Sequence, residues 1–134
     1  AAARLGRPAP LLIAVTVLTS MDAPTLASVG VTRPLDTQVE TLARMARDAG
    51  MDGVVASPLE TAAIRNACGS DFVVVTPGIR GASAGAGKDD QHRTMTPADA
   101  IRAGSSYLVV GRPIIGAVDP RAAAEAINRE LAGA

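Results

Sequence analysis

Aromatic residues, cysteine and histidine are almost absent from this sequence. Its 134 residues include one Phe, one Tyr, no Trp, one Cys and one His, while hydrophobic residues make up 48%. Binding of single-stranded nucleic acid relies on aromatic stacking and a basic surface. This chain has neither, since thirteen basic residues balance thirteen acidic ones. We therefore expect no nucleic-acid partner, and a core built from aliphatic side chains and Met.

Other absences limit the class of protein further. The single cysteine, Cys68, cannot form an internal disulfide, which fits a reducing compartment, and we expect a cytoplasmic protein. No zinc-like ligand spacing occurs, so we expect no metal. The longest apolar run, Leu11 to Leu18, is too short to cross a bilayer, and no signal pattern precedes it. Because Arg4 to Pro8 resembles a loop entering a strand, we expect residues 1–134 to be a single domain or a fragment.

Four strand-helix units follow one another along the chain. Apolar runs rich in β-branched residues predict buried strands, and segments with helical periodicity predict helices between them. The expected strands are 11–18, 53–56, 72–75 and 107–110. The expected helices are 34–49, 59–67, 96–104 and 119–131, with one or two further helical turns within 23–29. In the second of these helices we expect Ala63, Ile64 and Ala67 to face inward. This alternation predicts an α/β fold, a parallel sheet with helices outside.

Two architectures fit this pattern. One is a small doubly wound sheet, and the other is half of a (β/α)8 barrel, whose usual length of about 250 residues is close to twice this chain. In both, ligands bind at the carboxyl ends of the strands. Every predicted strand end carries hydroxyl groups, glycine or arginine: Thr19-Ser20, Ser57-Pro58, Thr76 to Arg80, and Gly111-Arg112-Pro113.

Gly111-Arg112 is a candidate phosphate site. Glycine lets a ligand approach the backbone, and arginine offers a planar fork of donors that matches a phosphate. Barrels often bind phosphate after a late strand, helped by a short extra helix. Spacing alone leaves a surface arginine in a tight turn equally open. Arg80 and Gln91 flank a loop rich in glycine and alanine, and loops of this length are often binding loops or lids.

The remaining polar residues carry weaker signals. His92 has no partner nucleophile in a known motif, and Asp89-Asp90 beside Lys88 is typical of a solvated loop tip. Cys68 lies near a predicted helix end, where we expect it to act as a small apolar residue. No Walker-type or G-x-G-x-x-G loop follows a strand.

Five segments occur together in an order that points to one family. They are Leu18-Thr19-Ser20-Met21, Asp52 to Ser57, Val75 to Arg80, Asp90-Gln91-x-Arg93, and Val110 to Ile114. As a set they resemble the carboxyl-terminal half of orotidine 5'-phosphate decarboxylase, from about Leu11 to Leu131. The succession P-G-I-R, D-Q-x-R and G-R-P-I at this spacing is specific, although each piece alone would be weak.

The resemblance implies a TIM (β/α)8 barrel, of which this chain supplies about the last four units. It implies a homodimer, when full length, that converts orotidine monophosphate (OMP) to UMP and CO2 in pyrimidine biosynthesis without a cofactor. By position, Arg80, Gln91, Gly111 and Arg112 match the family's contacts around the phosphate. Thr19 matches its hydroxyl contact near the pyrimidine, and Gln91 also reaches toward the base.

One departure from the family concerns the catalytic group, an Asp-x-Lys-x-x-Asp cluster on an earlier strand. Lys88 is the only lysine here and no such motif occurs, so the resemblance implies that this chain contains no catalytic residue of its own. Two alternatives stay open: a non-catalytic half-barrel that binds a phosphate or nucleotide, and another phosphate-handling barrel enzyme such as an isomerase or aldolase. A half-barrel would leave two exposed sheet edges, so we expect the isolated chain to self-associate or to be poorly soluble.

Overall fold

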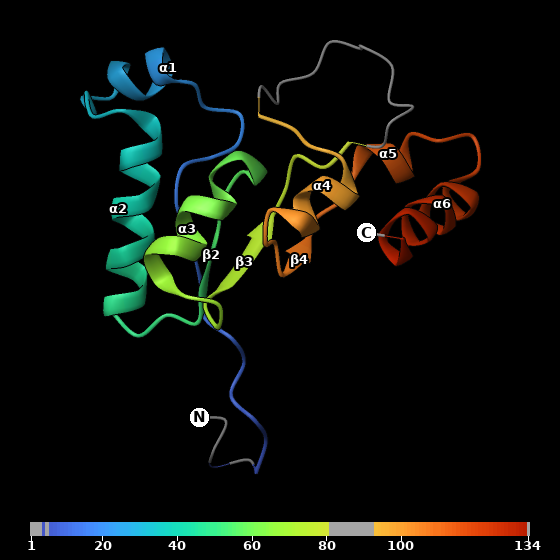
Figure 1. Cartoon of the computed structure of the whole chain (residues 1–134), viewed down its shortest axis with the longest axis horizontal. Helices are drawn as coiled ribbons and strands as arrows, with labels where there is room; N and C mark the ends of the chain where they lie inside the picture. The colour runs from blue at the N-terminus through green and yellow to red at the C-terminus, as the bar shows by residue number, and fades with distance from the viewer. Residues whose placement is uncertain (1–3, 5, 81–92, 134) are drawn as a thin grey trace.

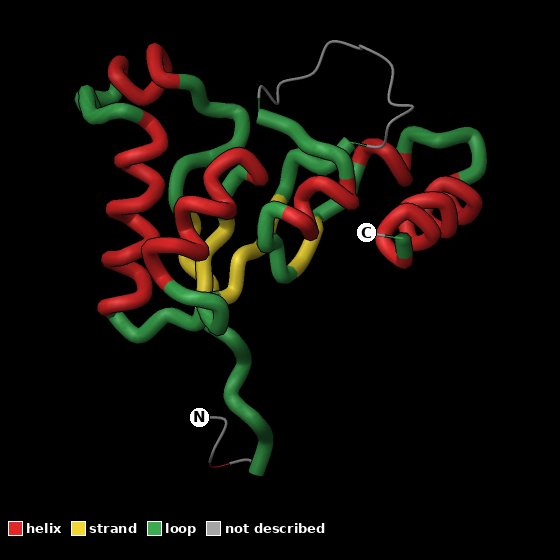
Figure 2. The backbone as a smooth tube through the Cα atoms, in the orientation of Figure 1, coloured by secondary structure: helices red, strands yellow, loops and turns green. Residues whose placement is uncertain are grey.

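Four short parallel strands form one sheet in the order β1-β2-β3-β4. The fold is seen in a computed structural model that describes residues 4, 6–80 and 93–133 (Figure 1). The strands are β1 Ile13–Val15, β2 Gly53–Val55, β3 Val73–Thr76 and β4 Tyr107–Leu108. The helices are α1 Ala23–Ser28, α2 Leu35–Asp48, α3 Thr61–Cys68, α4 Pro97–Arg102, α5 Arg112–Ile115 and α6 Pro120–Ala132, and a 3-10 turn, η2, covers Pro58–Glu60. Figure 2 shows the strands in the middle of the molecule with helices around them.

The predicted order of strands and helices is confirmed, but the strands are shorter than expected. β1 covers three residues of the apolar run 11–18, and β4 covers two residues of 107–110. A strand extends only as far as a neighbour provides hydrogen bonds, and β1 pairs with β2 only over Ile13–Val15. The hydrophobicity of one segment does not indicate how many residues of the neighbouring strand will pair with it.

The strand order decides between the two predicted architectures. A doubly wound sheet reverses its strand order at a switch point and carries helices on both faces. This sheet has no reversal, and right-handed crossovers between consecutive parallel strands place the helices on one face. The register aligns Val15, Val55, Val75 and Tyr107 in one row across the sheet. Val15 is 57% exposed and Tyr107 is 58% exposed, so no helix among the described residues covers the ends of this row. The sheet is therefore half of a barrel.

The opposite face of the sheet is closed by the helices. Val54 and Val74 lie side by side there and are fully buried. They belong to one cluster with side chains from α1, α2 and α3, among them Leu26, Val39, Ala43, Ala46 and Ile64. α2 packs against α3 and against β2. This aliphatic cluster is the core that the composition predicted.

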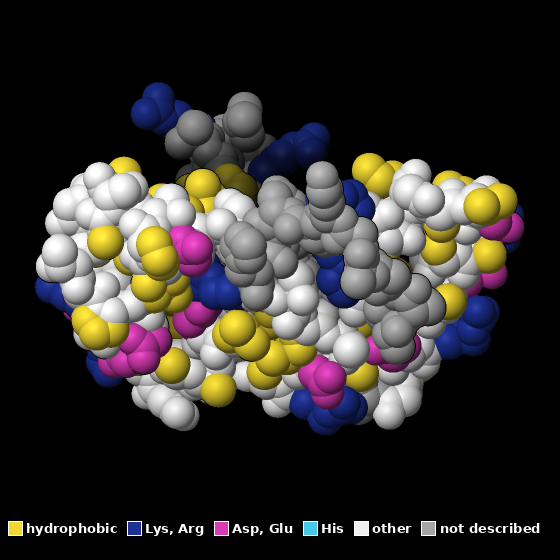
Figure 3. Space-filling view, turned by 90° about the horizontal axis from the view of Figure 1, so that it is seen from above, with side chains coloured by type: hydrophobic (Ala, Val, Ile, Leu, Met, Phe, Trp, Pro, Cys, Tyr) yellow, Lys and Arg dark blue, Asp and Glu magenta, His cyan; other side chains and the backbone are white. Residues whose placement is uncertain are grey.

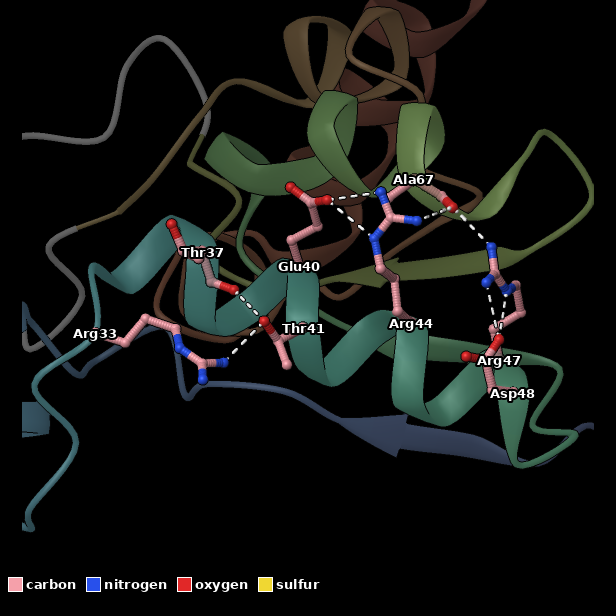
Figure 4. Close-up of polar contacts among 8 residues, drawn as sticks. All are labelled: Arg33, Thr37, Glu40, Thr41, Arg44, Arg47, Asp48 and Ala67. Carbon is pink, nitrogen blue, oxygen red and sulfur yellow. Dashed lines mark hydrogen bonds and ion pairs between the residues drawn. The ribbon is translucent and has the colours of Figure 1, made fainter.

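Two arginines of α2 bind the end of α3 (Figure 4). Arg47 donates to the Ala67 carbonyl oxygen at 2.7 Å and Arg44 donates to the same oxygen at 3.3 Å. Arg44 is also paired with Glu40 one turn earlier, at 2.8 Å. Carbonyl groups in the last turn of a helix have no partner within the helix, so cations stabilise them. The two helices are thus joined by polar contacts as well as by the core.

Two predictions of burial are wrong. The segments 11–18 and 107–110, expected to be buried strands, expose more than half of Leu12 and Val109, because no further strand or helix among the described residues covers them. The second concerns α3. Ala63 is exposed, whereas Ile64 and Ala67 are buried as expected. α3 starts only at Thr61, after the 3-10 turn, and its buried face follows Thr61, Ile64 and Ala67 at three-residue spacing. Ala63 immediately precedes Ile64 and therefore points about 100° away from that face.

Arg65 connects the third and fourth units. Its Nε donates to the Gly104 carbonyl at 2.7 Å and its Nη2 donates to the Ser106 hydroxyl at 2.6 Å. Nη1 reaches the Ser70 carbonyl at 2.9 Å and also the carbonyl of Phe72. One guanidinium therefore binds both the entry to β3 and the turn before β4. Within the part of the chain that the structure describes, no helix is long and apolar enough to cross a membrane.

Candidate functional site

The polar strand ends gather at one end of the sheet. Because all four strands are parallel, their carboxyl ends meet at the same edge. The strands run upward in Figure 1, so Figure 3, which is seen from above, looks onto this edge. It shows arginine side chains toward the middle of the face, with apolar groups at both sides.

Thr19 lies in a tight turn after β1. The turn is closed by the Met21 amide, which donates to the Leu18 carbonyl at 2.9 Å. Thr19 is only 6% exposed. No side-chain hydrogen bond joins it to another described residue. Among the described residues, the Thr19 hydroxyl group therefore has no hydrogen-bond partner.

The backbone of Arg80 is fixed after β3. Gly78 adopts φ +79°, a left-handed conformation that favours glycine, and turns the chain there. Ile79 then forms a parallel bridge with Met95. The Arg80 amide donates to the Met95 carbonyl at 3.0 Å, and the Met95 amide donates to the Gly78 carbonyl at 3.3 Å. Arg80 is thus anchored at the root of the segment 81–92.

Several predicted residues cannot be placed. Gln91, the fifth predicted ligand contact, lies outside the described residues. The same holds for Lys88, Asp89-Asp90 and His92, and for the predicted lid as a whole.

Gly111 and Arg112 follow β4 at the same edge. Arg112 begins the short helix α5, so a short helix does lie where a barrel phosphate site would have one. Gly111 is exposed and has a negative φ of −106°. A Cβ added there would meet nothing within 4 Å. Neither the sign of φ nor packing explains this glycine, and the space beside it is open.

A buried ion pair lies between these strand ends, and sequence reasoning missed it. Arg93 Nη1 pairs with Glu60 Oε1, and Arg93 Nη2 donates to the Leu18 carbonyl at 2.9 Å. Ser57 Oγ donates to the Arg93 carbonyl at 3.4 Å. Burial raises the pKa of the Glu60 carboxyl, and the charge of Arg93 opposes this rise. Arg93 belongs to the quoted D-Q-x-R motif, which was the one available signal, but its partner is 33 positions away.

Metal and thiol chemistry find no support in the described part of the chain. No group of three or more His, Cys, Asp or Glu residues there could hold a metal ion. Cys68 packs against the core, and burial raises the pKa of its thiol despite the nearby arginines. Cys68 therefore behaves as the small apolar residue that was predicted.

The class of protein follows from this arrangement: half of a (β/α)8 barrel with polar groups at the carboxyl ends of its strands. The family described as "Orotidine 5'-phosphate decarboxylase / HUMPS family" matches residues 1–127. The chain belongs to this family.

Individual relatives agree with this assignment. The chain is 59% identical to orotidine 5'-phosphate decarboxylase of Moorella thermoacetica, over 97% of this chain and 51% of that protein. It is 56% identical to the enzyme of that name from Trichlorobacter lovleyi, over 91% and 50%. Among solved structures, orotidine 5'-phosphate decarboxylase from Lactobacillus acidophilus matches with a TM-score of 0.75 and 44% identity, over 94% of this chain and 53% of that one. The chain therefore spans about half the length of the relatives it matches.

Proposed function

We propose that this chain is the phosphate- and base-binding half of an orotidine 5'-phosphate decarboxylase, which converts OMP to UMP and CO2 in pyrimidine biosynthesis. The observation that carries the proposal is the open space at Gly111 beside Arg112, on the same sheet edge as Arg80 and Thr19. Membership of the family supports it. The same resemblance implies a cytoplasmic homodimer that needs no cofactor.

In this proposal the two sides of the sheet bind different ends of one nucleotide. Arg112, Arg80 and Gln91 bind the phosphate together with the Gly111 backbone, because guanidinium groups match phosphate oxygens in pairs. Thr19 contacts the pyrimidine. β1 and β4 are three strand spacings apart, about 14 Å along a flat sheet and less along a curved one. The base and phosphate contacts are thus separated along the sheet, as the two ends of a nucleotide require.

Binding of the phosphate contributes to catalysis although the phosphate does not react. Contacts with a remote group raise kcat when they hold a closed conformation that only the right ligand produces. The residues that act on the carboxylate are not in this chain, because it lacks the Asp-x-Lys-x-x-Asp motif. We therefore propose that the chain alone does not decarboxylate OMP, whereas the protein with a complete barrel does.

The missing motif also favours a second candidate, a non-catalytic half-barrel that binds a nucleotide. The two candidates differ in one measurement, the release of CO2 from OMP by protein expressed from the complete coding sequence. A decarboxylase releases CO2, whereas a binding module retains UMP without turnover. An isomerase or aldolase is disfavoured by the named relatives at 59% and 56% identity, which are orotidine 5'-phosphate decarboxylases.

The decisive variant is Arg112→Ala. Losing a charge-assisted contact to phosphate is expected to remove about 2–5 kcal/mol of transition-state stabilisation, and kcat/KM should fall by the corresponding factor. Arg102→Ala is the matched control, because Arg102 is exposed on α4 and pairs only with Asp99 one turn away among the described residues. Steady-state kinetics should show a normal kcat/KM for the control. An unchanged kcat/KM in Arg112→Ala would contradict the assignment of the phosphate site.

A further inference from the structure

The Arg93 guanidinium connects the ends of two strands to the segment that follows the third. It binds Leu18 after β1 and Glu60 after β2, while Arg93 itself lies on the return from β3. We propose that Arg93 is a positioning residue. Its guanidinium fixes the orientation of the turn that presents Thr19 to the base of the nucleotide, and Glu60 fixes the position of that guanidinium. This proposal rests on the proposed function, because the proposed function assigns the base of the nucleotide as the ligand group that Thr19 contacts.

The contact with the turn is the first step. The Leu18 carbonyl accepts two hydrogen bonds of 2.9 Å, one from the Met21 amide, which closes the turn, and one from Arg93 Nη2. Thr19 shares its peptide plane with this carbonyl. Two donors from different parts of the chain therefore fix the orientation of the peptide that carries Thr19.

Arg93 is itself held at several points. Its side chain is 10% exposed and that of Glu60 is 7% exposed. Nη1 pairs with Glu60, and the backbone carbonyl of Arg93 accepts from Ser57 Oγ. The same Ser57 hydroxyl accepts from the Leu59 amide at 3.3 Å, which begins the turn that carries Glu60. Because the guanidinium is planar and rigid, fixing Nη1 on the carboxylate determines where Nη2 points.

A contribution to stability alone does not account for this pair. Glu60 Oε2 and Arg93 Nε are buried and have no hydrogen-bond partner among the described residues. Burying two charges costs desolvation, and well-packed apolar residues of the same volume are often as stable or more so. An ion pair with two unsatisfied atoms is a poor device for stability. The same pair does, however, direct the Arg93 Nη2 group at the Leu18 carbonyl.

The test compares two arginines, the buried Arg93 and the partly buried Arg65, each replaced by lysine, which keeps the positive charge but lacks the planar guanidinium. Arg93→Lys removes the simultaneous contact with Glu60 and Leu18. Arg65→Lys is the matched control, because Arg65 also bridges several carbonyls but contacts none of the strand-end residues of the site. Each variant of the full-length protein is titrated with UMP and with ribose 5-phosphate, which has the phosphate but no base.

The proposal predicts a selective loss. In Arg93→Lys the Kd for UMP should rise about tenfold, the loss expected for a misdirected hydrogen bond, while the Kd for ribose 5-phosphate changes less than about twofold. Arg65→Lys should leave the ratio of the two Kd values unchanged even if it lowers stability. Equal weakening of both ligands in Arg93→Lys, or no weakening, would overturn the proposal.

A second readout separates this proposal from the proposed function. If the wild-type protein binds no UMP, the proposed function fails, and the orientation of the turn is then followed without ligand. The Thr19 amide and methyl resonances should shift in Arg93→Lys and stay in place in Arg65→Lys. Unshifted Thr19 resonances in Arg93→Lys would show that Arg93 does not set the turn.

Discussion

The first three strand-helix units and the last one are packed very differently. The core cluster extends from Val17 to Val74, and its members include Val39, Val54 and Ile64, which are at most 1% exposed. α5 and α6 contain no buried residue, and Ile115 is 75% exposed. α6 packs on α4 and α5, and the turn before β4 is held by Arg65.

The first three units therefore contain the hydrophobic core, whereas the last unit contains Arg112, the proposed phosphate ligand. The earlier units pack around their own core, whereas the last unit buries little within the described chain. In a closed eight-stranded barrel, the exposed edge of β4 and the open face of the sheet meet other strands. If the barrel is closed in this way, we expect the packing around the proposed phosphate site to be completed by those strands.

The largest expected effect compares one isoleucine from each region. Ile64→Ala should lower the free energy of unfolding by about 4 kcal/mol, because Ile64 is fully buried and its truncation leaves a cavity. Ile127→Ala in α6 should cost about 1 kcal/mol, since Ile127 is only half-buried. Urea unfolding measures both. Equal losses would mean that the two regions are packed alike.

A smaller contrast is expected between two glycines. A Cβ on Gly53 would lie 2.2 Å from the Val73 carbonyl oxygen, so Gly53→Ala should cost about 3 kcal/mol by overpacking a backbone contact. The space beside Gly111 is open, so Gly111→Ala should leave stability within about 0.5 kcal/mol. If the glycine admits a phosphate, the same variant should still weaken binding of UMP. A Gly111→Ala protein that is destabilised, or that binds UMP normally, would contradict this role.

The smallest effect concerns pH. Burial raises the folded-state pKa of Glu60, so the folded state holds this proton more tightly than the unfolded state. The resulting stability is present below the ordinary glutamate pKa and is lost as pH rises through the raised value. Glu60→Gln should lack this decline. Urea unfolding of both proteins from pH 4 to 8, in steps of about one unit, measures the difference. Parallel pH profiles would show that the pKa of Glu60 is not raised.

Local sequence signals predicted most of the fold. Apolar runs and helix-start residues such as Thr96-Pro97 and Asp119-Pro120 are local, so the order of strands and helices could be predicted. The same signals predicted that Thr19, Gly111 and Arg112 follow strands, and the structure confirms this placement. Their role in ligand binding stays a prediction.

Features that depend on distant parts of the chain could not be predicted. The length of β1 is limited by β2, whose residues lie about 40 positions further along the chain. The exposure of Ala63 is a local miss, because it depends on the start of α3 at Thr61. The pairing of Arg93 with Glu60 joins positions far apart in sequence, and neither residue type indicates the other. The spacing of residues along the chain does not indicate which distant side chains will form an ion pair.

A crystal structure of the full-length protein with UMP tests the central claim most directly. The phosphate is predicted to lie against the Gly111 backbone and the Arg112 guanidinium, with Arg80 beside it and the pyrimidine at Thr19. A phosphate bound elsewhere, with Arg112 and Thr19 both away from the nucleotide, would contradict the proposed binding half.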